Sequence, residues 1–354
     1  MRKYLIVSIL IVLVAASGCK KDNKTITSNY IKGSISLNAP NYLIVSQPVD
    51  ISLALAITEP ESDIQYEFSL PSFSTETIIN TNGIITGLTA PSTPGTYTIT
   101  ATATHPDYSS ISAPAVTVIV FNPTLSDSYN GYINGENSMI DTRDNKEYHY
   151  THIGSLDWMT SNLQWAGAGQ SPDSTAALDL IYGRLYTWEE ATGGVSGSGV
   201  GGGATGVCPI GWSIPTNDDW ADFASALASA IAGTPSSLTF EDVWEGLGNH
   251  ASAEITINGD RQWSVYSPDN KHENTFKWNG APAGLSYIIN SDPGNETDAY
   301  SFLNRSNTGL WWSGTESNTD MAYYRHIDDQ SSNFPYERGN KKYLGLSVRC
   351  VRIH

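Results

Sequence analysis

Residues 208–216 read CPIGWSIPT and lead directly into a predicted helix. Thr216 is a good helix N-cap, and Asp218 and Asp219 favour a helix N-terminus. Beyond them the apolar residues share one helical face: Trp220, Phe223, Leu227 and Ile231. Gly233 is expected to end the helix. The segment therefore predicts an amphipathic helix with Cys208 just before its start.

The first residues have the order of a secretory signal. Arg2 and Lys3 precede an apolar run over residues 4–16, and small residues lead to Cys19. The run is shorter than the roughly 20 apolar residues that span a membrane. A Cys directly after Ala-Ser-Gly resembles a bacterial lipobox, which predicts a signal peptide over residues 1–18 and lipidation of Cys19. The alternative is an ordinary signal peptide with a free Cys nearby.

This N-terminus predicts a cell-envelope protein held to the membrane by its lipid anchor. Lys20-Lys21-Asp22 after Cys19 suggests delivery to the outer membrane and display at the surface, although inward display stays open. Residues 19–29 are polar and predict a tether.

The charge balance restricts the partners. The formal net charge is −17, and removal of Arg2 and Lys3 with the signal gives 17 − 36 = −19. A nucleic-acid-binding face would be basic, so nucleic acid is excluded as a partner. The length of 354 residues indicates two domains, or three.

Two cysteines, Cys208 and Cys350, remain after Cys19 is lipidated. The cell envelope is oxidising, so one disulfide between them is expected. The alternative is two buried free thiols. Two cysteines are too few for a thiolate metal site.

Residues 30–121 predict an all-β sandwich. Apolar residues alternate with small or polar ones around residues 51–57, 97–103 and 116–120. Asn82-Gly83 lies between two isoleucine pairs and predicts a hairpin turn. The pattern over residues 82–100 resembles bacterial immunoglobulin-like surface modules, which usually act as spacers. Residues 122–137 predict a linker.

All ten tryptophans lie beyond this linker, which marks a separate core or a binding surface. A second, shorter helix is expected around residues 184–191. Short strands and long loops complete an α+β segment over residues 138–354.

This segment resembles a bacterial surface family, the Fibrobacter succinogenes major paralogous domain (FISUMP). The matching blocks occur in the family's order: DTRDNKEY (141–148), IG (153–154) with WM (158–159) and NL (162–163), YGRLYTW (182–188), CPIGWSIPT (208–216), WS (312–313) with Glu316, and GLSVRCVR (345–352). The sequence departs from the family in a glycine-rich insertion over residues 193–206 and in Ser213, where His is common.

The resemblance implies a C-type-lectin-like fold, related to the formylglycine-generating enzymes. In such folds a disulfide ties a helix to the last strand, which agrees with the positions of Cys208 and Cys350. The family's molecular function is largely unassigned.

No catalytic motif is evident. Residues 197–202 match GxGxxG but lack the strand before and the helix after, so a flexible loop is expected. Formylglycine-type oxidation needs reactive cysteines, and both cysteines here have structural places. The adjacent acidic pairs at 189–190, 218–219 and 328–329 diverge on a helix and predict helix-end or solvated roles.

Metal and cofactor chemistry has little support. Calcium-dependent lectins use a Glu-Pro-Asn-type loop followed by Trp-Asn-Asp. This sequence offers Ser267-Pro268-Asp269-Asn270 and Trp278-Asn279-Gly280, without the carboxylate that Ca²⁺ would want. No metal ligand and no cofactor is therefore predicted, although a structural calcium stays open.

The richest aromatic and polar clusters supply the ligand-binding candidates: Trp311, Glu316, Tyr323, Tyr324, Arg325 and His326. Because neighbours in a strand point to opposite faces, Trp311 is expected outside and Trp312, by the family match, in the core. Packing in the core or at a strand edge is the alternative for Trp311, and a lone surface histidine is the alternative for His326.

The expected function is non-catalytic binding of a glycan or protein ligand through loops around residues 240–340 of the C-terminal domain. Two alternatives stay open. One is an enzyme or enzyme subunit acting on polysaccharide, with two carboxylates about 5–10 Å apart. The other is a structural component of a surface appendage, with an unpaired strand edge.

Overall fold

A computed structural model describes residues 29–123, 129–130, 133–264, 271–290 and 299–354. The predicted signal peptide, Cys19 and nearly all of the tether lie outside these ranges, as does the stretch Ser267–Asn270. In the described ranges no helix is both long and apolar enough to cross a membrane.

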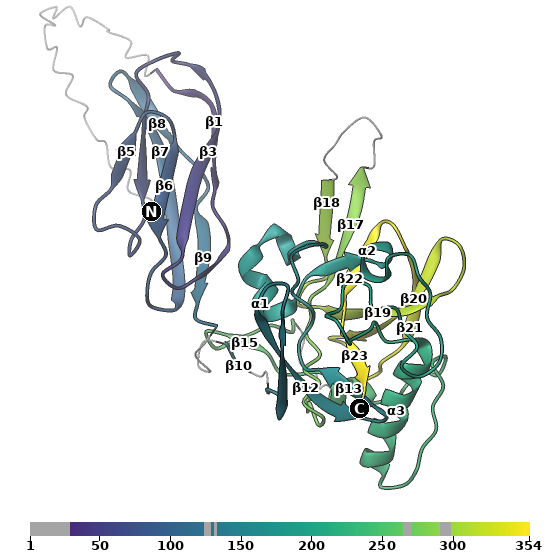
Figure 1. The fold of residues 1–354 in the computed structure, drawn as a ribbon. Coiled ribbons are helices and arrows are strands. Elements are labelled where there is room, and N and C mark those ends of the chain that lie inside the picture. The colour runs from purple at the N-terminus through teal and green to yellow at the C-terminus, as the bar shows by residue number, and fades with distance from the viewer. Residues whose placement is uncertain (1–28, 124–128, 131–132, 265–270, 291–298) are drawn as a thin grey trace, which may run out of the picture.

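The N-terminal domain is a sandwich of two sheets (Figure 1). One sheet has the order β1-β3-β6, and the other has the order β2-β9-β7-β4-β5 with β8 paired to β7. The strands are Lys32–Asn38 (β1), Tyr42–Ile44 (β2), Pro48–Glu59 (β3), Gln65–Ser69 (β4), Ile78–Asn80 (β5), Ile84–Thr89 (β6), Gly95–His105 (β7), Tyr108–Ser112 (β8) and Val116–Phe121 (β9). The inward-facing residues of both sheets form one core, which includes Ile51, Phe68, Ile99 and Val118. A β-sandwich is thus what the alternating pattern predicted, and its immunoglobulin-like assignment stays a prediction.

The predicted hairpin at Asn82-Gly83 is wrong. β5 pairs with β4 in one sheet and β6 pairs with β3 in the other, so the chain crosses between sheets at this turn. Asn80 closes the turn, since its Oδ1 accepts from the Gly83 N–H at 2.8 Å and its Nδ2 donates to the Ile84 carbonyl at 2.9 Å. The local turn chemistry was read correctly, but strand pairing is decided by the distant partners β3 and β4.

The described residues of the second domain, called the head below, form three sheets and four α-helices. Its strands are Tyr129–Asn130 (β10), Asn137–Asp141 (β11), Lys146–Ile153 (β12), Leu156–Met159 (β13), Leu185–Thr187 (β14), Thr256–Ile257 (β15), Asp260–Arg261 (β16), Leu285–Asn290 (β17), Ala299–Leu303 (β18), Thr308–Glu316 (β19), Met321–Asp328 (β20), Tyr336–Asn340 (β21), Leu344–Ser347 (β22) and Val351–Ile353 (β23). Its α-helices are Asp179–Tyr182 (α1), Trp188–Thr192 (α2), Asn217–Ala232 (α3) and Leu247–Ala251 (α4), and Pro172–Ser174 and Ala176–Leu178 form 3-10 turns.

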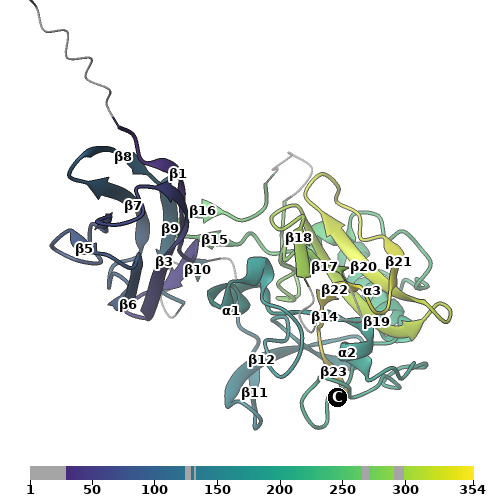
Figure 2. The same ribbon diagram turned by 90° about the horizontal axis from the view of Figure 1, so that it is seen from above.

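The main sheet of the head has the order β18-β17-β22-β19-β20-β21, with β14 beside β22. A second sheet, β11-β12-β13-β23, carries the last strand. Figure 2 shows α3 behind β19 and β20, with α2 beside β22 and β14. Apolar residues of α3 share one core with Trp311, and those of α2 share another with Trp312. The main sheet is therefore covered on both faces, and the head is β-rich.

The helix after Thr216 is confirmed. The Thr216 side chain accepts from the Asp219 N–H, and the Asp219 carboxylate accepts from the Thr216 N–H at 2.8 Å, so the two residues form a capping box. Gly233 ends the helix in a left-handed conformation. The shorter predicted helix is only partly right, because residues 185–187 form β14 and α2 begins at Trp188.

The glycine-rich stretch 193–206 is a loop, as was predicted for residues 197–202, and hydrogen bonds join it to the start of α3. The Gly199 and Gly201 N–H groups donate to the carboxylates of Asp218 and Asp219 at 2.7 and 2.6 Å. A Cβ on Gly203 would come within 1.8 Å of the Ile214 carbonyl oxygen. Glycine is needed here because two backbones touch.

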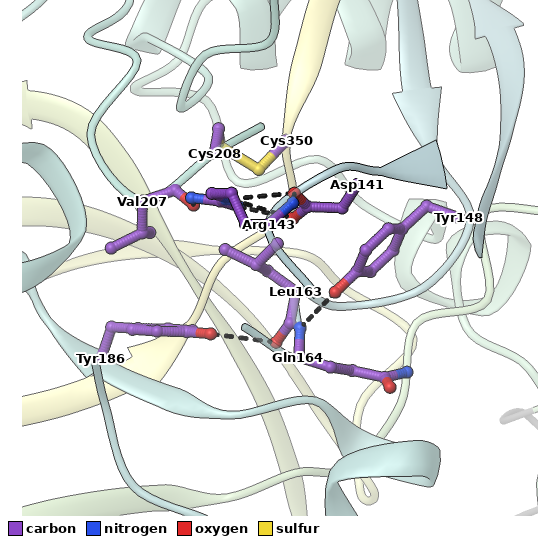
Figure 3. The surroundings of a disulfide bond; sticks show 9 residues. All are labelled: Asp141, Arg143, Tyr148, Leu163, Gln164, Tyr186, Val207, Cys208 and Cys350. Atoms are coloured by element: carbon purple, nitrogen blue, oxygen red, sulfur yellow. Dashed lines mark hydrogen bonds and ion pairs between the residues drawn. A yellow bond between two sulfur atoms is a disulfide. The ribbon is translucent and has the colours of Figure 1, made fainter. Parts of the chain in front are cut away.

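The Cys208–Cys350 disulfide is present and joins the segment before α3 to the residue before β23 (Figure 3). Arg143 lies beside it and pairs with the Asp141 carboxylate at 2.6 Å, while also donating to the Val207 carbonyl at 2.9 Å. Burial alone would raise the pKa of Asp141, but the hydrogen bonds from Arg143 outweigh it and lower that pKa.

The two domains meet in a shared core. Phe121 at the end of β9 is fully buried among head residues that include Leu178 and Ile255, and Tyr42, Ile44 and Ile119 pack against them. The Asn258 side chain donates to the Val120 carbonyl at 2.8 Å. Within the predicted linker 122–137, β10 pairs with β15 of the head. Apolar contacts and strand pairing therefore join the domains.

We predict that the double variant Cys208→Ala/Cys350→Ala loses about 2–5 kcal/mol of unfolding free energy, because the bridge closes a long loop. Thermal denaturation should show Tm lower by roughly 5–20 °C. Reductant should lower Tm of the parent protein and leave the variant unchanged. A parent protein whose Tm is insensitive to reductant would contradict this prediction.

Candidate functional site

The six predicted ligand-binding residues lie on β19 and β20, and the structure separates them. Trp311 and Arg325 are fully buried. The prediction that Trp311 faces outward is wrong, since Trp311 packs under α3 while Trp312 packs under α2. Alternation along the strand holds, but both faces of this sheet are covered. Nine of the ten tryptophans are buried in this way, so they form the core.

Trp311 belongs to a buried hydrogen-bond cluster centred on Asn162, called the Asn162 hub below. The Asn162 Oδ1 accepts from Trp311 Nε1 at 2.8 Å and from Arg349 Nε and Nη2 at 3.1 and 2.7 Å. Its Nδ2 donates to the Tyr182 carbonyl at 2.7 Å and to the Ser347 hydroxyl at 3.1 Å. One amide thus connects α1, β19, β22 and the segment before β23.

Arg325 also has a structural role. Its guanidinium lies over the rings of Trp244, Phe240 and Tyr336. It donates to the backbone carbonyls of Phe240, Asp242 and Phe334. Burial lowers its pKa to about 9. Arg325 and its neighbour His326 point to opposite faces of β20, so they do not form one anion site.

The other four candidates are at least partly accessible. Tyr323 packs against Phe240 and Tyr336 on one face of β20. On the other face Tyr324 contacts Trp312, and burial raises its pKa to about 12. His326 lies 3.2 Å from the Asp328 carboxylate. Glu316 is exposed at the end of β19 and pairs with Lys341 Nζ at 3.0 Å.

Lys341 leads to a polar pocket that sequence reasoning missed. A hollow of about 180 Å³, called the 341 pocket below, is lined by Glu189, Thr319, Asp320, Asn340, Lys341, Lys342 and Tyr343. These residues come from α2, the loop between β19 and β20, and the turn between β21 and β22. Figure 1 places α2, β17 and β22 at the same end of the head.

Backbone hydrogen bonds hold the walls of the 341 pocket together. The Glu189 N–H donates to the Lys341 carbonyl at 3.2 Å, and the Lys341 N–H donates to the Asp320 carbonyl at 3.0 Å. The Tyr343 carbonyl accepts from the Ile288 N–H of β17 at 3.0 Å. The Lys341 side chain is largely buried and lies over the Trp188 ring. The pocket is therefore a formed feature of the fold.

The pocket offers uncommitted polar groups. Within the described part of the chain, the carboxylates of Glu189 and Asp320 and the Lys342 ammonium make no hydrogen bond or ion pair. The Tyr343 ring lies 6.4 Å from the ring of Tyr287, which is 43% exposed on β17. Carboxylates, an ammonium and tyrosine rings at one place can bind hydroxyl groups and stack on an apolar ring face.

The turn sequence Asn340-Lys341-Lys342-Tyr343 could have marked this pocket, since it is polar and ends in an aromatic residue. It could not identify Glu189 and Asp320, which are distant in sequence. Of the predicted residues, Glu316 alone contacts a residue that lines the pocket.

Asn279, which was compared with a calcium-lectin motif above, has a structural role. The Asn279 side chain is buried and bonds to Asn274, to the backbone of Ile133 and to the Thr160 carbonyl. It is therefore occupied as a structural bridge. Ser267–Asn270 lie outside the described residues.

We predict that Asn162→Ala lowers the unfolding free energy by about 3 kcal/mol or more, because Arg349 and Trp311 lose a buried acceptor. Urea denaturation measures this change. The matched control is Asn318→Ala on an exposed turn, where Asn318 Oδ1 accepts two backbone N–H groups and the loss should stay below about 1 kcal/mol. Equal losses in the two variants would contradict a central role for the hub.

Comparison with known proteins identifies one family that matches the head. The family model described as the Fibrobacter succinogenes major domain matches residues 151–352. Neither a curated protein nor a solved structure gives a significant match. The matched range contains the Asn162 hub, both disulfide cysteines and the 341 pocket. Membership of this family suggests a cell-surface protein, and the match covers more than half of the sequence. The chain belongs to the Fibrobacter succinogenes major domain family.

Proposed function

We propose that this chain is a lipid-anchored protein of the cell envelope whose head is a non-catalytic module that binds a glycan at the 341 pocket. The observation that carries the proposal is the chemistry of that pocket. Uncommitted carboxylates, an ammonium and a tyrosine ring converge there on a backbone frame that is already formed. Sugar hydroxyls need donors and acceptors in fixed positions, and the apolar face of a sugar ring packs on an aromatic ring.

The size of the pocket sets the class of glycan. A hollow of about 180 Å³ is smaller than the 300–1,000 Å³ typical of sites that enclose a whole ligand. It suits one sugar residue at the end or side of a longer chain. The exposed Tyr287 beside Tyr343 extends the apolar surface for a second residue.

The N-terminal domain fits a spacer. Its β-sandwich carries none of the residues that line the 341 pocket, and Phe121 at the end of β9 is buried among apolar residues of the head. A spacer of this kind would hold the head away from the lipid to which Cys19 is proposed to be anchored.

A catalytic role has less support. General acids among carboxylates have a raised pKa and an accessible position. Burial raises the pKa of Asp179 and Asp219, but both are engaged in structural hydrogen bonds. Asp179 binds Arg184 and Ser171, and Asp219 caps α3. Neither lines the 341 pocket.

The lipid anchor is tested at Cys19. Mass spectrometry of protein isolated from membranes should find acyl chains on Cys19 as the first residue, since the thiol is lipidated and cleavage after Gly18 makes Cys19 residue one. Cys19→Ser should release the protein into the soluble fraction. Protease treatment of intact cells then reports on which side the head is displayed. An unmodified Cys19 in membrane-bound protein would overturn the anchor.

Glycan binding is tested with the full chain in detergent on a glycan array, followed by titration of the best ligand. We expect Tyr343→Ala and Asp320→Asn each to weaken binding at least tenfold, about 1.4 kcal/mol, through the loss of stacking and of an acceptor. The matched control is Tyr30→Ala, an exposed tyrosine of the N-terminal domain, which should bind as the parent does.

Two results would count against this function. One is the absence of any saturable glycan, with capture of a protein partner instead. The other is unchanged glycan affinity in both pocket variants, which would place the site elsewhere on the head.

A further inference from the structure

The second sheet of the head carries a cluster of two histidines and a buried aspartate. His152 at the end of β12 and Asp157 on β13 are cross-strand partners, and Asp157 is also paired with Arg352 on β23. His354 directly follows β23. The hairpin of β12 and β13 holds His152 beside Asp157, and the pairing of β23 with β13 brings the distant His354 to the same end of the sheet.

The donor atoms of the three residues converge. His354 Nδ1 lies 2.9 Å from Asp157 Oδ1, and His152 Nδ1 lies 3.5 Å from the same oxygen. The two imidazole rings are 4.1 Å apart between centroids. One ligand atom from each residue lies within 4.8 Å of the others. Among the described residues, no other group of three or more His, Cys, Asp or Glu side chains has this arrangement.

We propose that His152, Asp157 and His354 bind a divalent transition metal ion of the Zn²⁺ class. Two ligands that each lie about 2.0–2.1 Å from a tetrahedral zinc are about 3.4 Å apart, which is close to the spacing observed here. Imidazole nitrogens with one carboxylate oxygen are donors for zinc and its neighbours, whereas Ca²⁺ and Mg²⁺ prefer oxygen alone. This inference does not depend on the proposed glycan binding.

Arg352 positions the carboxylate. Its Nε donates to Asp157 Oδ2 at 3.0 Å, which leaves Oδ1 facing the two histidines. The guanidinium lies over the rings of Tyr150 and Trp212 at 4.5 and 4.8 Å, so it is itself held in place. Outer partners of this kind orient a ligand and strengthen a metal site. Burial alone would raise the pKa of Asp157, but the hydrogen bonds that it accepts from His354 and Arg352 lower that pKa.

Solvent can reach the cluster. The side chains of His152 and His354 are 48% and 67% exposed. His152 also lines a hollow of about 320 Å³ together with Tyr150, Phe276 and Lys277. Three protein ligands leave a fourth position for water. A bound ion would tie the end of β12 to β13 and to the segment after β23.

Metal binding should depend on pH, because protons compete for the imidazoles. The charged groups around the cluster are Arg352 on β23, Asp222 of α3, which bonds Ser155 in the turn between β12 and β13, and the Glu136–Lys277 pair near His152. Zinc affinity should therefore be lower at pH 5.5 than at pH 7.5.

The test is calorimetric titration of the full chain in detergent with ZnCl₂ at pH 7.5. We expect one saturable site, which is weakened at least tenfold by His152→Ala and by His354→Ala. Both side chains are exposed, and the Tm of each variant without zinc checks that it is folded. The matched control is His326→Ala. His326 also pairs with a carboxylate, that of Asp328, but it lies outside the cluster of His152, Asp157 and His354.

Thermal denaturation supplies a second readout, since zinc should raise Tm of the parent and of His326→Ala but not of His152→Ala. The proposal is overturned if the parent shows no saturable zinc site, if both cluster variants bind zinc as the parent does, or if His326→Ala loses as much affinity as they do. Titration with CaCl₂ should give the same result for the parent and for the two cluster variants, because the cluster is not expected to bind Ca²⁺.

Discussion

The head is organised around one buried amide oxygen. Asn162 Oδ1 accepts hydrogen bonds from the Arg349 guanidinium and from the Trp311 indole, in a part of the core from which water is excluded. A buried guanidinium is costly unless its N–H groups are satisfied. Arg349 meets this requirement with Asn162 and with the carbonyls of Met159, Trp278 and Asn279. The segments that contribute these acceptors must therefore converge on the residue beside Cys350.

Three of the buried tryptophans and the other cation in the core, Arg325, also donate hydrogen bonds to acceptors in the fold. α2 and α3 cover opposite faces of the main sheet. The indole N–H groups of Trp188 and Trp312 donate to carbonyls of that sheet, and the indole N–H of Trp311 donates to Asn162. Arg325 lies over aromatic rings and caps backbone carbonyls. Because these groups are committed to the fold, the surface chemistry of the head is left to its turns, where the 341 pocket lies.

The 341 pocket and the cluster of two histidines and an aspartate lie on different sheets, and they suit different kinds of ligand. The 341 pocket has exposed charged side chains on a frame of backbone hydrogen bonds, which suits a polar ligand. The cluster of His152, Asp157 and His354 joins strands β12 and β13 to the end of β23, which suits an ion that stabilises the fold. The two can be tested independently for this reason.

The sequence by itself determined what depends on neighbours along the chain. Thr216 and Asp219 form the capping box of α3 within one turn, Gly233 ends that helix, and the alternating N-terminal strands form a sandwich. The motif blocks identified the family, and the cysteine count indicated the disulfide.

Only the tertiary structure decided what depends on contacts between distant segments. The alternation rule assigned Trp311 and Trp312 to opposite faces correctly, but it could not show that helices 80 or more positions earlier would cover both faces. The turn at Asn82-Gly83 was recognisable, yet β3 and β4 decided that its strands belong to different sheets. Asp320 and Glu189 meet at one pocket, and His152 meets His354, only because strand pairing brings them together. Local conformational preferences act over a few residues, whereas burial and strand pairing act across the whole chain.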